Sequence, residues 1–154
     1  MPALESLPLI EVVGTARAGL AMEKAITLTT RLARIAHNAT LELTHYGRKT
    51  GQPYEVLIWF IVEDETIYLA TLNKDRQWCR NVRVNPQVSL RIGRETFDGE
   101  VEALTSPVEK AHVAELVKSK YWYARPFICF MKMIGREAIS AAFRVTLVPS
   151  DIVA

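Results

Sequence analysis

The chain has 154 residues, of which 49% are hydrophobic and 23% are charged, and this composition is typical of one globular domain. The 19 Lys and Arg residues exceed the 17 Asp and Glu residues by only two, so the formal net charge is +2. A charge this small makes a nucleic-acid partner improbable, and it means that any anion site must be a local cluster. We therefore expect a single domain over residues 1–154.

The cysteines and the hydropathy pattern exclude further classes of protein. Two cysteines, Cys79 and Cys129, are too few for a disulfide-dense scaffold, and no motif has the spacing of a metal site. No apolar run approaches the roughly 18 residues of a transmembrane helix. The N-terminus carries Glu5 and Glu11 and lacks the pattern of a signal peptide, so we expect a cytoplasmic protein without a bound metal.

The predicted elements begin with an N-terminal arm and a helix. Residues 1–20 contain Pro2, Pro8 and Gly14, and we expect an irregular arm. From Ala21 onward, apolar residues recur at alternating spacings of four and three. This periodicity predicts an amphipathic helix that lays its apolar stripe on a sheet. The stripe consists of Ala21, Ala25, Leu28, Leu32 and Ile35.

Period-two alternation and β-branched residues predict six strands after this helix. These strands cover residues 39–46, 54–63, 66–71, 88–92, 97–104 and 143–148. A short helix from Asp75, as its cap, to Val84 separates the third and fourth strands. Ser106 and Glu109 form a capping box for a helix that ends near Lys120. Residues 121–142 read as helical in two pieces split at Gly135.

These predictions define the fold class. Consecutive strands with short connections favour antiparallel pairing, and strands that do not alternate with helices disfavour a Rossmann sheet. We predict a mainly β protein with helices (α+β), in which six antiparallel strands close into a small barrel.

One candidate anion site is the turn between the first two strands, which reads Gly47-Arg48-Lys49-Thr50-Gly51. Glycines allow a tight turn with exposed N–H groups, the Arg48 guanidinium is a two-pronged donor, and Thr50 adds a hydroxyl. Such a loop suits a phosphate or a carboxylate. The alternative is a solvated hairpin tip that happens to be basic.

A second candidate site follows the third strand. Lys74 and Arg76 precede the short helix that carries Trp78, Arg80 and Asn81. One side of this helix can pack while another meets an anion near its N-terminus. The alternative is that Trp78 anchors the core and the arginines are solvated.

Aromatic residues form a third set, which includes Trp59 in the second strand and the run Tyr121-Trp122-Tyr123. An apolar segment, residues 127–134, continues this run. Flat conjugated ligands bind between such side chains, but aromatic clusters also form ordinary cores. The histidines His37, His45 and His112 have no partner at catalytic spacing and are interpreted as structural or surface groups.

The ordered motifs resemble those of the deazaflavin-dependent nitroreductase family. The resemblance rests on the Gly47–Gly51 turn, on residues 67–70, on Trp78-x-x-Asn81 and on Asn85-Pro86-x-Val88. It covers about residues 40–104. The family fold is the split β-barrel, which is shared with flavin-binding proteins similar to pyridoxamine-phosphate oxidase.

The resemblance implies binding of the reduced deazaflavin coenzyme F-420 and hydride transfer to an electron-poor acceptor such as a quinone, an enone or a nitro compound. The phosphodiester and polyglutamate tail of the coenzyme would lie on the basic loops. Trp59 would line the acceptor pocket, and Tyr123 or Tyr121 would donate a hydrogen bond to the acceptor. The residues then expected to bind the cofactor are Arg48, Lys49, Thr50, Thr71, Leu72, Lys74, Trp78 and Asn81.

Three alternatives stay open at this point. The loop after the third strand lacks glycine, and Leu57 stands where the family usually has proline, so FMN is a possible substitute for F-420. A barrel that binds a ligand without catalysis is the second alternative. The third concerns assembly: the chain is a monomer or a homodimer, and the helix over residues 21–36 together with residues 127–134 either belongs to the buried core or touches a second subunit or a membrane surface.

Overall fold

The computed structural model describes residues 9–124, 126 and 139–148. Most of the segment expected to form two helical pieces before the last strand lies outside these residues. In chain order the elements are α1 (Leu9–Ile35), β1 (Leu41–Tyr46), β2 (Pro53–Glu63), β3 (Thr66–Thr71), α2 (Gln77–Val84), β4 (Gln87–Ile92), β5 (Glu95–Ala103), α3 (Pro107–Lys120), the 3₁₀ turn η1 (Trp122–Ala124) and β6 (Ala141–Leu147).

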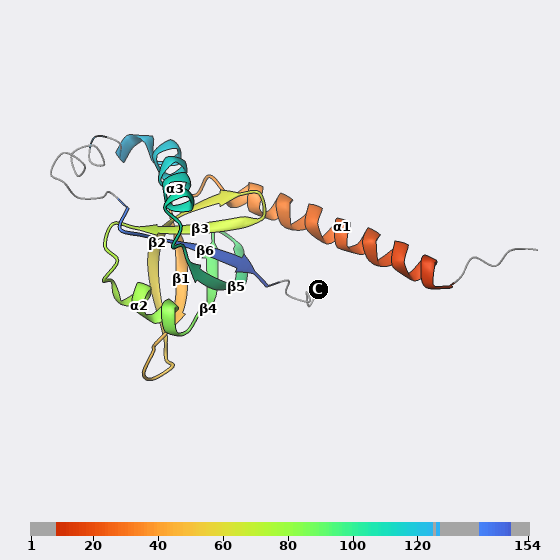
Figure 1. Cartoon of the computed structure of the whole chain (residues 1–154), viewed down its shortest axis with the longest axis horizontal. Helices are drawn as coiled ribbons and strands as arrows, with labels where there is room; N and C mark the ends of the chain where they lie inside the picture. Colours follow the sequence, from red (N-terminus) through yellow and green to blue (C-terminus); the bar gives the residue numbers. More distant parts are fainter. Residues whose placement is uncertain (1–8, 125, 127–138, 149–154) are drawn as a thin grey trace, which may run out of the picture.

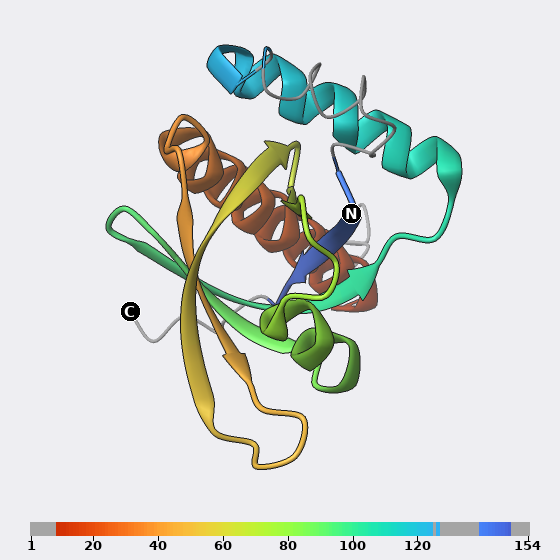
Figure 2. The same ribbon diagram turned by 90° about the vertical axis from the view of Figure 1, so that its left-hand side faces the viewer.

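The six strands close into a barrel in the order β1-β2-β3-β6-β5-β4, and every pair is antiparallel. Figure 2 shows the strands wrapping around one interior. The alternation in β1 explains this arrangement, because Leu41, Leu43 and His45 are buried while the residues between them are partly exposed. The predicted fold class, a six-stranded antiparallel barrel with helices, is confirmed.

Helices close the barrel and cover one side of it. Trp78, Cys79 and Val82 of α2 join the interior cluster from one end, and Leu32 and Ile35 of α1 join it from the other. The helix α3 lies across the outside of the barrel (Figure 1), where Ile61, Ala70, Leu104, Val113, Val117, Tyr121 and Ala142 form a second cluster.

The antiparallel order decides which loops meet. Because neighbouring strands run in opposite directions, β1 and β3 end at the same end of the barrel, which is also where α2 lies. The β1–β2 loop therefore meets α2 at this end, where Asn81 and Asn85 bond to it. The other basic loop singled out in the sequence, residues 72–76, starts further back, because β3 ends at Thr71 and its neighbour Ala70 pairs with Trp59 in the middle of β2.

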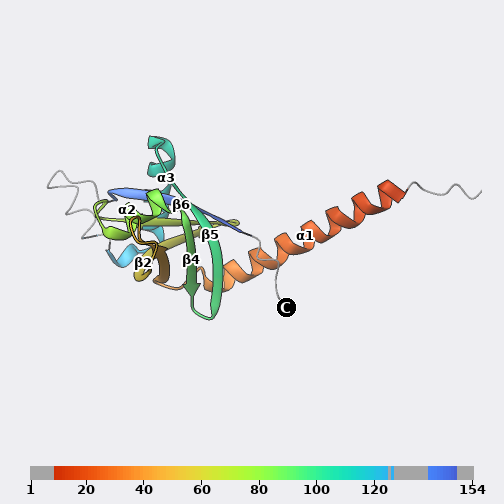
Figure 3. The ribbon, with the colours of Figure 1, turned by 90° about the horizontal axis from the view of Figure 1, so that it is seen from below.

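The helix α1 begins earlier than predicted. It starts at Leu9 rather than Ala21, and it projects away from the barrel (Figures 1 and 3). Residues 9–20 contain no proline, and an internal glycine such as Gly14 costs only about 1 kcal/mol relative to alanine. The predicted apolar stripe is correct near the C-terminal end of α1, where Leu32 and Ile35 are buried, and wrong at Ala21, which is exposed.

Two local predictions are wrong and one is right. The N-cap of α2 is Arg76, whereas the backbone N–H of Asp75 donates to Asn73 Oδ1 at 2.9 Å. The last strand begins at Ala141, inside the segment expected to be helical, because it pairs with β3 from Thr71 onward. The predicted N-cap of α3 is right: Ser106 Oγ accepts a hydrogen bond from the N–H of Glu109, whereas the Glu109 carboxylate pairs with Arg144 and does not complete the capping box.

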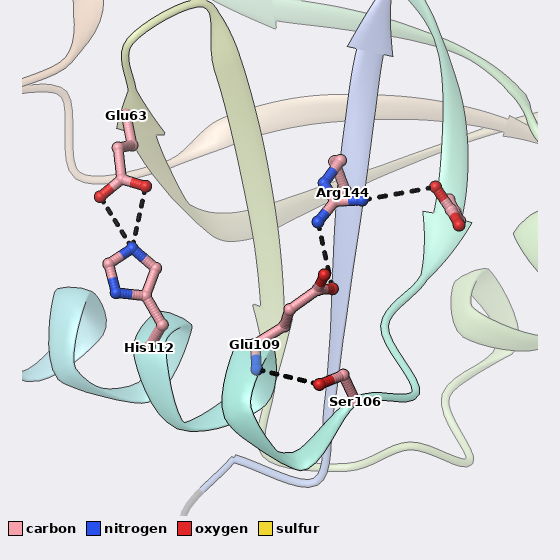
Figure 4. A network of polar contacts seen from close by, with 6 residues as sticks. Glu63, Ser106, Glu109, His112 and Arg144 are labelled. Carbon is pink, nitrogen blue, oxygen red and sulfur yellow. Dashed lines mark hydrogen bonds and ion pairs between the residues drawn. The ribbon is translucent and has the colours of Figure 1, made fainter.

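Polar contacts fix α3 over the barrel (Figure 4). His112 Nε2 lies 2.8 Å from Glu63 at the end of β2. Arg144 on β6 pairs with Glu109 at 3.1 Å and with Glu102 at 3.6 Å. His112 thus occupies the surface position expected for it. Among the described helices, none is both long enough and apolar enough to cross a membrane.

Candidate functional site

The β1–β2 loop is a tight turn at the mouth of the barrel. The N–H of Gly47 donates to Gln52 O at 2.9 Å, and the N–H of Gly51 donates to Gly47 O at 2.8 Å. Gly51 has a φ of 71°, a conformation that other L-residues rarely adopt. A side chain on Gly47 would meet Thr50 Oγ1 at 2.8 Å. The path of the loop therefore requires glycine at position 51, and a side chain at position 47 would displace Thr50.

Amide side chains of α2 hold this loop in place. Gln77, Asn81 and Asn85 recur every four residues and so lie on one helix face. The Asn81 Oδ1 atom accepts hydrogen bonds from the backbone N–H of Arg48 at 3.3 Å and from its Nη1 at 2.9 Å. The Asn85 Nδ2 atom donates to Gly47 O at 2.9 Å. The loop thus rests on α2.

Behind Asn81 lies His45, on the inner face of β1. Its Nδ1 atom is 3.1 Å from Asn81 Nδ2, and its ring stacks on Tyr54 with a centroid distance of 5.7 Å. Burial lowers the pKa of His45 below its usual value, because the charged imidazolium loses solvation. His45 is consequently part of the support of the loop.

A pocket of about 250 Å³ opens where the loop meets α2. Arg48 and Lys49 supply positive charge, Thr50 supplies a hydroxyl, and Gln77 adds an amide at the start of the helix. Asn81 engages one of the five N–H donors of Arg48, so the rest of the fork is open to a ligand. This donor set is suited to an anion. The lining residues are Gly47, Arg48, Lys49, Thr50, Tyr54, Gln77 and Asn81.

The β3–α2 loop, residues 72–76, leads from the end of β3 into α2. Thr71 is buried, and its hydroxyl bonds to the backbone of Asn73 at 3.2 Å. Leu72 is half-buried, and Lys74 is exposed with its backbone N–H bonded to Ser140 Oγ at 3.2 Å. Thr71 shapes the loop, whereas Lys74 is exposed and is not among the residues that line the pocket.

Trp78 has a different place from the one expected. It is 2% exposed and belongs to the barrel core, where its ring lies 5.3 Å from that of Phe143. No surface of Trp78 is left for a cofactor, so it contributes by anchoring α2. Asn81 is fully buried as well and acts through Arg48.

The aromatic residues form a separate cluster on the outer face of β2. Trp59 is half-buried and stacks on Tyr121 with a centroid distance of 4.6 Å. Tyr123 is 58% exposed and meets the edge of Tyr121 at 6.0 Å. Tyr54 of the anion pocket faces the interior, whereas Trp59 faces outward, so the two clusters lie on opposite faces of one strand.

Tyr121 is not placed as a hydrogen-bond donor to a substrate. It is 1% exposed, and its hydroxyl donates to Ala39 O at 2.6 Å and accepts from the N–H of Phe60 at 3.2 Å. Burial raises the pKa of Tyr121 to about 12, which makes it a weaker acid than a free tyrosine. Tyr123 is left as the candidate donor.

Sequence reasoning missed three residues of the anion pocket or its support, namely His45, Tyr54 and Gln77. Helical spacing was a usable signal for Gln77, since it precedes Asn81 by one turn. For His45 and Tyr54 the signal was weaker, because their contact depends on the β1–β2 register, which pairs them directly.

Known structures with this architecture include oxidoreductases. One match is described as an F420-H2 dependent reductase (FDR-A), with 22% identity over 70% of this chain and 94% of that one and a TM-score of 0.57. Another is a putative pyridoxamine 5'-phosphate oxidase from Listeria innocua, with 15% identity over 79% of this chain and 93% of that one and a TM-score of 0.59. These likenesses establish the split-barrel fold.

A third solved structure is described as a domain-swapped dimer, with 23% identity over 70% of this chain and 80% of that one and a TM-score of 0.58. A search among curated proteins found no match.

The sequence itself establishes the family. The model of the F420H(2)-dependent quinone reductase family matches residues 16–125, which is more than two thirds of the chain. The chain belongs to this family. The resemblance stated from the motifs is thereby confirmed, and the family name identifies F-420 as the coenzyme of the family.

Proposed function

We propose that this protein binds the reduced coenzyme F-420 and uses it to reduce an electron-poor organic acceptor, such as a quinone, an enone or a nitro compound. The observation that carries the proposal is the pocket at the mouth of the barrel, with Arg48, Lys49 and Thr50 on one loop. Family membership supports the choice of coenzyme. The identity of the acceptor within these classes is part of the proposal.

The residues of the pocket fit the acidic part of such a coenzyme. A volume of about 250 Å³ accommodates a phosphodiester or a carboxylate rather than a whole fused-ring cofactor. Arg48 and Lys49 would hold this acidic part, and Lys74 would add charge from the neighbouring loop. Thr71 and Leu72, at the end of β3, would lie beside the ring.

When bound, the reduced coenzyme supplies a hydride from C5 of its ring. The chain itself holds the coenzyme by its charged part, excludes water and orients the acceptor. Trp59 on the outer face of β2 would form a wall for a planar acceptor, and the Tyr123 hydroxyl would donate a hydrogen bond to the oxygen on which negative charge develops. A ligand that touches both clusters must be longer than the anion pocket.

The first test is a binding experiment with Lys49→Ala. Lys49 is exposed, so its interaction with an anion is screened by solvent, and we expect a loss of about 1 kcal/mol, or roughly a fivefold higher dissociation constant for oxidised F-420. Calorimetry at low salt measures this constant. Lys24→Ala on α1 removes the same charge from an exposed position away from the pocket and serves as the matched control.

Each outcome separates the candidate functions. Binding of FMN in place of F-420 would overturn the cofactor assignment, and an unchanged constant for Lys49→Ala would remove the loop from the site. Tight binding of F-420 without turnover of quinones, enones or nitroaromatics would favour a non-catalytic binding protein. Cytoplasmic localisation and the choice between monomer and homodimer stay predictions.

A further inference from the structure

The hydrogen bonds around Asn81 fix the orientation of its amide. Two N–H groups of Arg48, the backbone one and Nη1, point at the same side-chain atom. Both groups can only donate, so this atom must be the carbonyl oxygen of Asn81. The amide nitrogen of Asn81 therefore faces His45.

This orientation in turn fixes the protonation of His45. The Asn81 Nδ2 atom is a donor and lies 3.1 Å from His45 Nδ1, so Nδ1 must accept and carry no proton. The ring is neutral, with its proton on Nε2. Its burial agrees with this state, since desolvation lowers the pKa of His45.

The surroundings of His45 offer little support for a positive charge. Tyr54 from β2 stacks on the ring and Asn81 from α2 bonds to it, while Arg48 lies behind Asn81 as a cation. Among the described residues, no carboxylate forms a hydrogen bond or an ion pair with this histidine. A proton on Nδ1 would have only the Asn81 amide as its neighbour.

We propose that His45 is a positioning residue for the anion pocket: in its neutral form it fixes the Asn81 amide in the orientation that holds Arg48. A proton on Nδ1 turns that nitrogen into a donor, and the Asn81 amide must then reverse to offer its oxygen. The reversed amide presents its NH₂ group to the two N–H donors of Arg48. Because two donors cannot form a hydrogen bond with each other, the bonds between Asn81 and Arg48 are lost, and Arg48 is released from α2.

The proposed role of His45 predicts a specific change in hydrogen exchange. At about pH 7.5 the backbone N–H of Arg48 is protected by Asn81, and at about pH 5 its protection factor, corrected for the intrinsic exchange rate, falls roughly tenfold or more. The N–H of Gly51 is an internal control, because it bonds to Gly47 O within the same loop and not to Asn81. NMR-detected exchange resolves both amides.

Two variants distinguish positioning from mere packing. His45→Asn keeps an acceptor at the same bond distance from the backbone as Nδ1 and has no proton to gain, so Arg48 protection stays high at both pH values. His45→Phe keeps the ring that stacks on Tyr54 but removes the acceptor, so protection is low at both pH values. If Gly51 loses protection together with Arg48, or if His45→Asn retains the acid-induced loss, the proposal is wrong.

The consequence for ligand binding rests on the proposed function, and it is measured separately. The dissociation constant of oxidised F-420, determined by calorimetry at about pH 7.5 and about pH 5.5, should change with pH more in the wild type than in His45→Asn. An equal change in both proteins contradicts the link between the protonation of His45 and ligand binding in the pocket. Absence of coenzyme binding in both proteins refutes the proposed function. The exchange experiment then still tests whether His45 positions Asn81 and Arg48.

Discussion

Tyr121→Phe tests whether this tyrosine supports the fold rather than the reaction. The β1–β2 register pairs Leu41 with Ile58, so Ala39 would face Phe60 two residues further along. The ladder stops at Leu41, and the Tyr121 hydroxyl bonds to Ala39 O and to the N–H of Phe60 in its place. The side chain thus replaces backbone pairing where β1 has not yet begun.

The expected loss of stability follows from these bonds. Removing the hydroxyl loses a short hydrogen bond worth roughly 1 kcal/mol and leaves the N–H of Phe60 without this partner in a buried position, which costs roughly 1 kcal/mol or more. Phenylalanine retains the stacking on Trp59. We therefore expect the free energy of unfolding to fall by about 2 kcal/mol.

Urea unfolding followed by circular dichroism measures this change, with Tyr123→Phe as the control. The Tyr123 side chain is 58% exposed, so its variant should differ from the wild type by less than about 0.5 kcal/mol in stability. Activity should show the opposite pattern, with kcat reduced in Tyr123→Phe. A Tyr121→Phe variant of unchanged stability and collapsed kcat would refute the reasoning and restore Tyr121 as the hydrogen-bond donor.

Three further variants probe the barrel and α3. Gly99→Ala should lower the free energy of unfolding in urea by about 1–3 kcal/mol, because the new Cβ would lie 2.5 Å from Val145 Cγ1 and 3.0 Å from Thr146 O. A loss below about 0.5 kcal/mol would contradict this close packing of β5 against β6. Burial lowers the pKa of Lys120 to about 8, so from about pH 8 to 10 the unfolded chain binds more protons than the folded one. The free energy of unfolding of the wild type should therefore rise with pH over this range relative to that of Lys120→Met. Parallel pH profiles of the two proteins would disprove this. Ser106→Ala removes the N-cap of α3 and should lower the melting temperature through a loss of about 1 kcal/mol, whereas an unchanged value would mean that the cap contributes nothing.

Strands and the capped helix could be predicted because their signals are local. The alternation in β1 reflects one buried and one partly exposed face, and Ser106 caps α3 through the N–H of Glu109 within one turn. The start of α1 could not be predicted in this way. Residues 15–24 of this helix are exposed, so periodicity carried no information there, and prolines and glycines suggested an irregular arm.

The candidate site was predicted in part for the same reason. The Gly47–Gly51 turn can be recognised in the sequence by the glycines on either side of its basic residues, and it lines a pocket in the structure. The roles of Trp78 and Tyr121 depend on contacts with Phe143 and Phe60, which are distant in the sequence. Residue type alone does not distinguish a buried aromatic from one that faces a ligand.

Barrel closure also limits how copies of this chain can associate. Each of the six described strands has a neighbour on both sides, so a foreign strand can be added only where a strand extends beyond its neighbour, as in β2, where residues 53–58 pair with β1 alone. Sheet extension between molecules is therefore restricted to such short stretches. Two copies can join through contacts of helices and loops, or by exchanging a segment so that each barrel is completed by the other chain.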